Sequence, residues 1–313
     1  MEQPTNEKSE EAVAQLYVLS PLVNFASDLE EIQLGDNLAI ALPTNEEKRI
    51  VEEDSSSSAL SHLRVLHEWQ FVIRSVIRLR MKEEQYITDD YDFQSGPYRC
   101  CTALRLLKEG TVGLGPQYLM LSPPLKLVTR MGKADTFYYD TWGKYLLTTS
   151  EVSEFKNLYG IITRLDYSKY RRIRIALLRF DFSYNVGLLY QLIDLMIAFE
   201  ALYIADEKEL GYKMAARASF LLAETVEQRN HIFNLLKKAY ALRGKVVHGG
   251  ELPDRIGISK GKYLSSIEFT SQIRGLLRDS IKRFIELLNS YSHKQLLETV
   301  LDSNIMAEGS LLK

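Results

Sequence analysis

The sequence predicts an α+β fold, in which a mixed, partly β N-terminal domain precedes an α-helical bundle. The first half of the chain gathers apolar residues in short runs rich in β-branched residues and tyrosine, which is typical of strands. From about residue 151 the apolar residues recur at helical spacing instead. The 313 residues are enough for about two domains of ordinary size. We therefore expect an accessory or recognition domain over 1–150, a helical bundle over 151–305 and a flexible tail over 306–313.

The composition is that of an ordinary globular protein, with 46% hydrophobic and 26% charged residues. No apolar run approaches the ~18 residues that a membrane-spanning helix needs, and the polar, acidic N-terminus is unlike a secretory signal. The two cysteines are too few for a disulfide framework. These features favour a cytoplasmic protein without a membrane partner, and they indicate no metal or cofactor.

Charge is distributed unevenly along the chain. The first 57 residues carry 13 acidic and 3 basic side chains, a balance of −10, so the remainder of a chain with an overall charge of −2 carries +8. A basic second part is compatible with a polyanionic partner such as RNA, and an ordinary solvated surface explains it equally well.

The first half contains both apolar runs and breakers. Two short apolar runs, Leu16–Phe25 and Leu38–Leu42, lie in the acidic segment, whose acidic and serine-rich end, Glu52–Ser58, is expected to be an exposed loop. Leu63–Leu79 fits one strand, two strands or a helix, and its β-branched content favours a strand. Cys101–Glu109 is predicted to be a short helix that stops at the following glycine.

Two further segments of the first half, Gln117–Val128 and Thr136–Thr149, are rich in tyrosine and threonine and are expected to be extended. The pair Pro123-Pro124 interrupts the first of them as a breaker.

The second half predicts helices joined by short loops, which makes an antiparallel bundle the expected arrangement. The strongest signal lies in 185–205, where six apolar residues form one stripe. Ser150 stands at the N-cap position of the first helix, and Gly249-Gly250 end the fourth. The predicted helices cover residues 151–159, 185–205, 213–224, 226–247, 264–291 and 293–301.

The sequence lacks the phosphate loop, the paired metal-ligand spacings and the nucleophile elbow of well-known enzyme classes. Among its five histidines, His248 has the most suggestive neighbours, because Arg243 and Lys245 precede it at a predicted helix end. Histidine passes protons in either direction near neutral pH, and arginine holds phosphate oxygens through two parallel hydrogen bonds. Five residues along a regular helix correspond to about 140° of rotation. Either the helix ends between Arg243 and His248, or a second copy of the motif completes the site.

Glu200 lies on the same helical face as three apolar residues of 185–205, so its carboxylate is predicted to point towards the interior. A buried carboxylate needs a cationic partner, for which Arg217 and Arg243 are the candidates. Pairing with Arg243 would orient the guanidinium for catalysis. A Glu–Arg pair that only fixes helix register explains the pattern equally well.

Three segments of the second half together resemble the HEPN superfamily, and within it the Apea-like branch. These segments are Asp194–Tyr203, Lys213–Leu222 and Ala239–Gly249. The last contains the defining pattern of the superfamily, Arg, four to six residues, then His, as Arg243 and His248. The pattern alone is common by chance, and its place at a helix end after the other two segments makes it more specific. The resemblance covers about 185–290, and looser similarity extends into the first half.

The resemblance implies a helical bundle that forms a homodimer and brings two Arg-x4-His motifs into one cleft. Active members are metal-independent endoribonucleases, often toxins or defence effectors that work with an antitoxin or effector partner. By this resemblance, His248 acts as general base or acid on the ribose 2′-hydroxyl or the leaving oxygen, and Arg243 stabilises the phosphorane. The product would be a 2′,3′-cyclic phosphate, and DNA would not be cut. Glu200, Lys245 and Tyr240 are predicted to support the pair.

One position departs from the pattern of nuclease-type members. Gly244 stands where such members commonly have a polar residue, and glycine weakens a helix locally by about 1 kcal/mol. Many members of the superfamily are inactive. The alternative function is therefore a non-catalytic nucleotide-, RNA- or protein-binding and dimerisation module on the same fold, with a structural Arg/His pair.

Two basic clusters are candidates for RNA contact. Arg274, Arg278 and Lys282 recur every four residues along the longest predicted helix. Basic side chains that follow phosphates and tyrosines that stack on bases are typical of RNA-binding surfaces, and a solvated helix face has the same spacing. The second cluster consists of Arg164, Lys169, Arg171, Arg172, Arg174 and Arg179 with Tyr159, Tyr167 and Tyr170.

Overall fold

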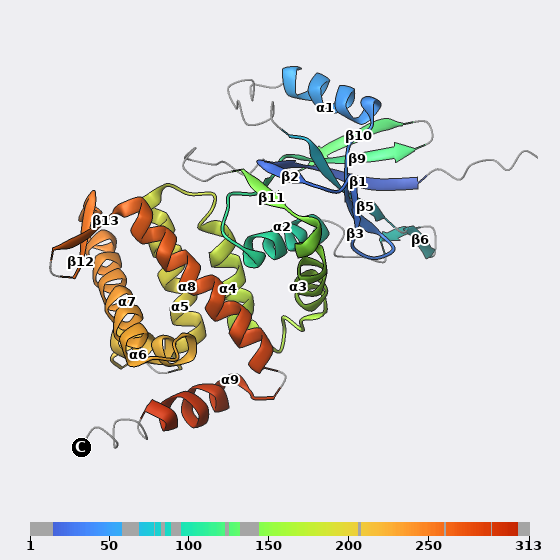
Figure 1. The fold of residues 1–313 in the computed structure, drawn as a ribbon. Helices are drawn as coiled ribbons and strands as arrows, with labels where there is room; N and C mark the ends of the chain where they lie inside the picture. Colours follow the sequence, from blue (N-terminus) through green and yellow to red (C-terminus); the bar gives the residue numbers. More distant parts are fainter. Residues whose placement is uncertain are drawn as a thin grey trace, which may run out of the picture. The chain divides into compact units, whose positions relative to one another are not determined.

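The computed structural model has an N-terminal region that contains a sheet and a C-terminal region that is mainly helical, so the predicted α+β class is confirmed (Figure 1). The predicted tail over 306–313 lies outside the described residues. The structure describes residues 15–57, 69–77, 79–82, 85–88, 95–122, 125–131, 144–205, 208–259, 261–288 and 290–305.

The chain divides into two compact units. The first comprises residues 1–101, 111–135 and 143–163, and the second comprises 102–110, 136–142 and 164–313. This division differs from the predicted boundary at 150/151, because helix α3 (Val152–Arg164) belongs to the first unit except for its last residue. The segment Thr102–Gly110 belongs to the second unit although it lies early in the chain.

An antiparallel sheet forms the centre of the first unit, with the strand order β10-β9-β1-β5-β4-β3 and with β8 paired to β1. Its strands are β1 (Gln15–Val23), β3 (Glu31–Gln33), β4 (Leu38–Ala41), β5 (Phe71–Ile77), β8 (Gly113–Leu114), β9 (Gln117–Ser122) and β10 (Lys126–Met131). Two smaller sheets pair β2 (Phe25–Ser27) with β11 (Tyr145–Leu147) and β6 (Leu79–Lys82) with β7 (Gln85–Thr88).

Strand β1 lies inside this sheet because its residues are apolar on both faces. Val18, Leu19 and Leu22 are fully buried, and β5 and β9 flank the strand on its two sides. The apolar runs at 16–25 and 38–42 therefore become strands.

The remaining strand predictions are confirmed where the structure describes them. The strand favoured within Leu63–Leu79 is β5, and residues 63–68 lie outside the described ranges. The extended segment at 117–128 forms β9 and the start of β10. Of 136–149, residues 136–143 lie outside the described ranges and the rest contains β11.

The predicted loop at Glu52–Ser58 is wrong, because helix α1 (Asn45–Ser57) extends through most of it. Thr44 and Glu47 cap the start of α1: the Glu47 amide donates to Thr44 Oγ1 at 3.1 Å, and the Thr44 amide donates to Glu47 Oε2 at 2.7 Å. Val51 is fully buried in a cluster with residues of β1, β5 and β9. Capping and this apolar contact stabilise a helix whose composition alone suggested a loop.

Glu47 also fastens α1 to the sheet. Arg74 on β5 donates its Nε to Glu47 Oε1 at 2.8 Å and its Nη2 to Oε2 at 2.6 Å, and the Tyr17 hydroxyl donates to Oε1 at 3.1 Å. Burial alone would raise the pKa of Glu47, but the hydrogen bonds from Arg74 and from the Thr44 amide hold it below its usual value.

Helix α2 (Ser95–Leu107) confirms the helix predicted over 101–109 and begins six residues earlier. The chain turns after it at Gly110, whose φ of +145° suits glycine. Cys100 and Cys101 are buried thiols on α2, and burial raises the pKa of the Cys100 thiol.

The helix predicted over 151–159 is α3, and the second unit contains the other five predicted helices at positions close to those expected, with α7 coinciding with its predicted range. These five are α5 (Leu188–Tyr203), α6 (Leu210–Leu222), α7 (Val226–Val247), α8 (Ser266–Leu287) and α9 (His293–Gln295), which continues into the π-helical turn η4 (Leu296–Asp302). Helix α4 (Arg171–Phe182) also belongs to this unit and was not predicted. A hairpin of β12 (Arg255–Ser259) and β13 (Lys262–Ser265), which was not predicted, joins α7 to α8. Ser150 is not a cap, because Thr148 forms the capping box with Glu151. None of the helices within the described ranges is long and apolar enough to span a membrane.

Helix α5 is the central helix of this unit, since it packs against α4, α6, α7 and α8 (Figure 1). Its buried residues therefore extend beyond the predicted stripe, of which Leu192 and Met196 are buried and the other four residues are half-buried. Near its C-terminal end, the Tyr203 hydroxyl donates to Ser280 Oγ of α8 at 2.8 Å, and the Tyr203 ring meets Phe284 edge-on at 5.0 Å. This packing fixes the C-terminal end of α5, where Glu200 lies.

Candidate functional site

The predicted site lies where α5 faces α7. Glu200 projects from the last turn of α5, and its Oε1 lies 3.8 Å from Nη2 of Arg243 on α7. The two side chains are 23% and 27% exposed, so this is a loose, half-buried ion pair. Pairing of Glu200 with Arg243 is thus confirmed, but the carboxylate lies at the edge of the interior and is not enclosed in it.

Arg217, the other candidate partner of Glu200, is committed elsewhere. Its Nε and Nη2 donate to the two carboxylate oxygens of Asp302 at 2.8 and 2.7 Å, and its Nη1 donates to the carbonyl of Tyr203 at 2.5 Å. Arg217 therefore joins α6 to the C-terminal turn and to the end of α5, which is a structural role.

The guanidinium of Arg243 is only partly satisfied. Its Nε is buried and has no hydrogen-bond partner among the described residues. Among the described residues, the guanidinium forms an ion pair only with Glu200, and the distance between Nη2 and Oε1 is longer than that of an ordinary hydrogen bond. A buried N–H without a partner is destabilising, so the guanidinium would be stabilised by donating to a further oxygen ligand.

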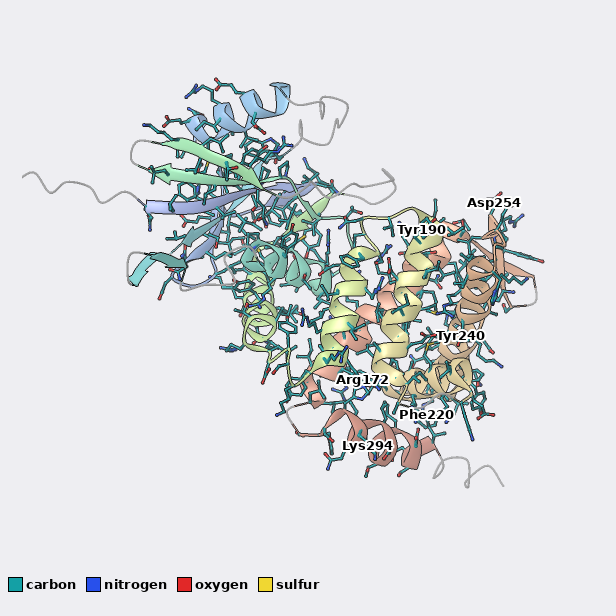
Figure 2. The ribbon with its side chains drawn as sticks, turned by 180° about the vertical axis from the view of Figure 1, so that it is seen from behind. Arg172, Tyr190, Phe220, Tyr240, Asp254 and Lys294 are labelled. Carbon is teal, nitrogen blue, oxygen red and sulfur yellow. The ribbon has the colours of Figure 1, made fainter. Side chains whose placement is uncertain are left out.

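Tyr240 lies one turn before Arg243 on α7 (Figure 2), with its ring centroid 6.0 Å from the guanidinium carbon. Gly211 of α6 makes room for this ring, since a Cβ atom there would lie 2.6 Å from Cδ1 of Tyr240. Burial, and then the charge of Glu200, raises the pKa of Tyr240. The phenol is therefore protonated at neutral pH and can donate a hydrogen bond beside Arg243.

His248 is the C-cap of α7, with φ −92° and ψ 19°. Behind it the helix ends in a Schellman motif: the Gly250 amide donates to the Lys245 carbonyl at 2.9 Å, and the Gly249 amide donates to the Val246 carbonyl at 3.0 Å. Gly249 has the φ of +86° that this motif requires. The imidazole of His248 and the side chain of Lys245 are consequently exposed at the helix end.

Arg243 and His248 do not converge within one chain. Helix α7 is continuous from Arg243 to the C-cap, so the helix does not end between them. About 140° of rotation separates their directions, and no hydrogen bond or ion pair joins the two among the described residues. Gly244 lies next to Arg243 on this helix, and a Cβ atom there would have no neighbour within 4 Å.

The predicted RNA-contact stripe on α8 is wrong for two of its three members. Arg274 is 3% exposed and Arg278 is 8% exposed. Arg274 donates to Ser183 Oγ, to the Ser183 carbonyl and to Gln191 Oε1 at 2.8–3.2 Å, and Arg278 donates to the Arg105 carbonyl at 2.9 Å. These arginines face the interior because their hydrogen-bond partners lie on neighbouring segments.

Aromatic packing completes the environment of the buried arginines. The guanidinium carbons of Arg105 and Arg274 lie 4.5 and 4.6 Å from the ring centroid of Tyr184. Burial lowers the pKa of Arg274, and the charges of Arg278 and Arg105 add to this. Lys282 is half-buried on the same helix and remains a candidate for RNA contact.

Members of the second basic cluster have different surroundings in the structure. Arg179 forms an ion pair with Asp194 at 2.8 Å, so it serves the packing of α4 on α5. Lys169, Arg171 and Arg172 instead line a cavity of about 540 Å³ between the start of α4 and the end of α8. The other side of this cavity, Leu288 and residues 290–293, was missed, because nothing in a single sequence connects segments more than 110 residues apart.

No group of three or more histidine, cysteine, aspartate and glutamate side chains suited to a metal ion occurs within the described ranges. In comparisons with family models, with curated proteins and with solved structures, nothing matches this chain.

Proposed function

We propose that the chain is a metal-independent endoribonuclease of the HEPN type, whose site combines Arg243 and His248 from two copies of the chain. The observation that carries this proposal is the buried Nε–H of Arg243, which has no partner among the described residues and lies five residues before an exposed histidine. The Arg-x4-His pattern of the resemblance gives these two residues their roles.

The reaction needs one proton-transfer group and one fixed positive donor. His248 removes the proton of the ribose 2′-hydroxyl, whose oxygen attacks the adjacent phosphorus, and water protonates the departing 5′ oxygen. Arg243 donates to the phosphoryl oxygens, which gain negative charge in the phosphorane. The bond to the 5′ oxygen breaks and a 2′,3′-cyclic phosphate remains. Tyr240 and Glu200 hold the guanidinium, and Lys245 adds positive charge for the RNA backbone.

A second copy is needed because the two side chains leave α7 in different directions. In a two-fold symmetric dimer, Arg243 of one copy faces His248 of the other, and two equivalent sites form. Val247, next to His248, is an apolar side chain that is 51% exposed and would be covered in such a dimer. RNA is the substrate in this proposal, and an antitoxin or effector protein is the expected regulatory partner.

Cleavage of mixed RNA in EDTA tests the proposal. Arg243→Ala and His248→Ala are each expected to reduce the cleavage rate by about 10²-fold or more, with cyclic phosphate ends on the wild-type products. His231→Ala is a matched control, since His231 is exposed on the same helix outside the motif. Cleavage by the two motif variants at the wild-type rate would refute the assignment.

Mixing the two inactive variants tests the shared site. A heterodimer of Arg243→Ala and His248→Ala contains one site with both wild-type side chains, so an equilibrated mixture is expected to recover about a quarter of the wild-type activity. No recovery from a mixture shown to form heterodimers would contradict a site built from one arginine and one histidine of different copies.

The ion pair of Arg243 with Glu200 favours the alternative, a non-catalytic nucleotide-, RNA- or protein-binding and dimerisation module. In this function the arginine holds α7 against α5, and Gly244 leaves the helix surface without a polar side chain. The folded wild-type protein would then leave RNA intact, and Glu200→Gln and Arg243→Ala would weaken dimerisation equally, as measured by light scattering.

A further inference from the structure

The cavity between α4 and α8 is separate from the residues considered so far. Its walls are Lys169, Tyr170, Arg171 and Arg172 on one side and residues 290–293 on the other. The buried residues Ile173 and Leu288 also line it, and the Tyr170 hydroxyl donates to the Leu288 carbonyl at 3.4 Å. At about 540 Å³ it has the volume of a small-molecule site. Arg172 and Tyr240, both labelled in Figure 2, lie on different helices, α4 and α7.

The described lining residues include three cations and no carboxylate. Arg172 donates to the backbone carbonyls of Ala201 and Ile204 at the end of α5, which hold its guanidinium, and it forms no ion pair with a carboxylate of the described residues. The ammonium of Lys169 lies 5.0 Å from the Tyr170 ring centroid. The nearest acid in sequence, Asp166, accepts hydrogen bonds from Ser168 and from the Lys169 amide within its own turn.

The position of these cations is unfavourable for the helix that carries them. Arg171 and Arg172 occupy the first turn of α4, a helix of 12 residues without an acidic residue in that turn. The N-terminal end of a helix carries partial positive charge, so cations there raise the free energy of the folded chain. An anion bound in the cavity would compensate the helix end and all three side chains together.

His293 lies on the opposite wall and responds to the same charges. Its Nε2 is 2.7 Å from the Leu202 carbonyl, and its ring stacks on Phe284. Burial lowers its pKa to about 4, and the nearby Arg172 and Arg217 contribute to this. At neutral pH the imidazole is therefore uncharged, and it can donate to the carbonyl while its other nitrogen accepts.

We infer that this cavity binds a small organic molecule that carries a polyphosphate group. The phosphates lie against Lys169, Arg171 and Arg172 at the start of α4, and the hydroxyl of Ser290 donates to their oxygens. The rest of the volume, bordered by Tyr170 and Tyr291, receives the organic part. The cavity contains neither Arg243 nor His248, so this inference does not depend on RNA cleavage.

Calorimetric titration of the full chain with tripolyphosphate tests the anion site. The double variant Lys169→Gln/Arg171→Gln changes two exposed side chains and is expected to bind about tenfold more weakly or worse. Arg255→Gln/Lys262→Gln removes the same charge from the exposed β12–β13 hairpin of the same unit and is expected to bind as wild type does. Equal binding by both double variants, or no binding by wild type, would overturn the site.

Two further titrations make the test specific. ATP is expected to bind more tightly than tripolyphosphate, and equal affinities would overturn the organic part of the inference. Bound polyphosphate should raise the pKa of His293, followed by NMR of the imidazole, because a nearby anion stabilises the imidazolium. A pKa that stays constant under saturating ligand would place the anion elsewhere. Arg243→Ala is expected to bind tripolyphosphate normally, so failure of RNA cleavage and failure of anion binding are separate results.

Discussion

Two arginines of the helical unit differ in how completely their environment satisfies them. Arg274, inside the packing of α8, is 3% exposed and donates hydrogen bonds to Ser183 and Gln191. Arg243, near the end of α7, is 27% exposed, lies 3.8 Å from Glu200 and has a buried Nε without a partner in the described part of the chain. The comparison teaches that the partners of an arginine, more than its spacing on a helix, distinguish a structural role from a ligand-binding one.

The largest effect expected from this contrast is on stability. Arg274→Ala leaves the carbonyl of Ser183 and the amide oxygen of Gln191 without donors and opens a cavity beside Tyr184. We expect a loss of about 3–4 kcal/mol in the free energy of unfolding. Arg243→Ala removes a loose, half-exposed ion pair and should cost about 1 kcal/mol or less. Urea denaturation followed by circular dichroism measures both, and equal losses would break the comparison.

The sequence predicts elements well where local periodicity decides them. The range 226–247 is a helix in the sequence and in the structure, because its apolar residues recur at helical spacing and two glycines stop it. Helix α1 was missed because only a narrow apolar face, with Val51 at its centre, distinguishes it from a polar loop, and that face needs the sheet to become favourable. The β12–β13 hairpin is short and joins two strongly helical segments.

The hydrogen-bond and ion-pair partners of a side chain are harder to predict from the sequence than helices and strands are. The spacing of Arg274 and Arg278 places both on one side of a helix but does not say what that side faces. Each follows a fully buried apolar residue, Ile273 and Leu277, by one position, which is the available hint. Arg217 was one of two candidates for Glu200, and its actual partner, Asp302, lies 85 residues further along the chain.

A second, smaller effect on stability concerns two histidines of the helical unit. His248 at the end of α7 is exposed, whereas His293 at the start of α9 is half-buried. The folded-state pKa of His293, about 4, lies below the ordinary value of 6.5. The unfolded chain therefore binds a proton more readily, and stability falls as the pH is lowered from about 6.5 to about 4. The contribution is at most about 3 kcal/mol, and solvent contact of the ring reduces it.

Unfolding of wild type and of His293→Gln at pH 7 and pH 5 measures this contribution. The difference at pH 7 reports the loss of ring packing on Phe284, and the change in that difference between the two pH values reports the titration. We expect the wild type to lose more stability than the variant on acidification. Parallel losses would show that the ring is not held in its uncharged form.

The smallest effect concerns two glycines at the end of α7, which have equal space and different backbone conformations. A Cβ atom at either Gly244 or Gly249 would have no neighbour within 4 Å. Gly244 lies within the helix, whereas Gly249 has a φ of +86°. Gly244→Ala should therefore stabilise the protein by about 0.5–1 kcal/mol, because alanine loses less backbone entropy on folding. Gly249→Ala should destabilise it by about 1 kcal/mol, because a side chain is strained in the left-handed region.

Thermal denaturation of the two alanine variants resolves effects of this size. Opposite shifts of Tm would show that Gly244 is a tolerated substitution in a regular helix and that Gly249 is required by the turn that exposes His248. If both variants lose stability, the helix end is strained before the C-cap, and the direction of Arg243 depends on Gly244. In that case the backbone conformation at Gly244 would help to keep the Nε of Arg243 without a partner. The difference between Arg243 and Arg274 would then arise from the backbone as well as from the side-chain partners.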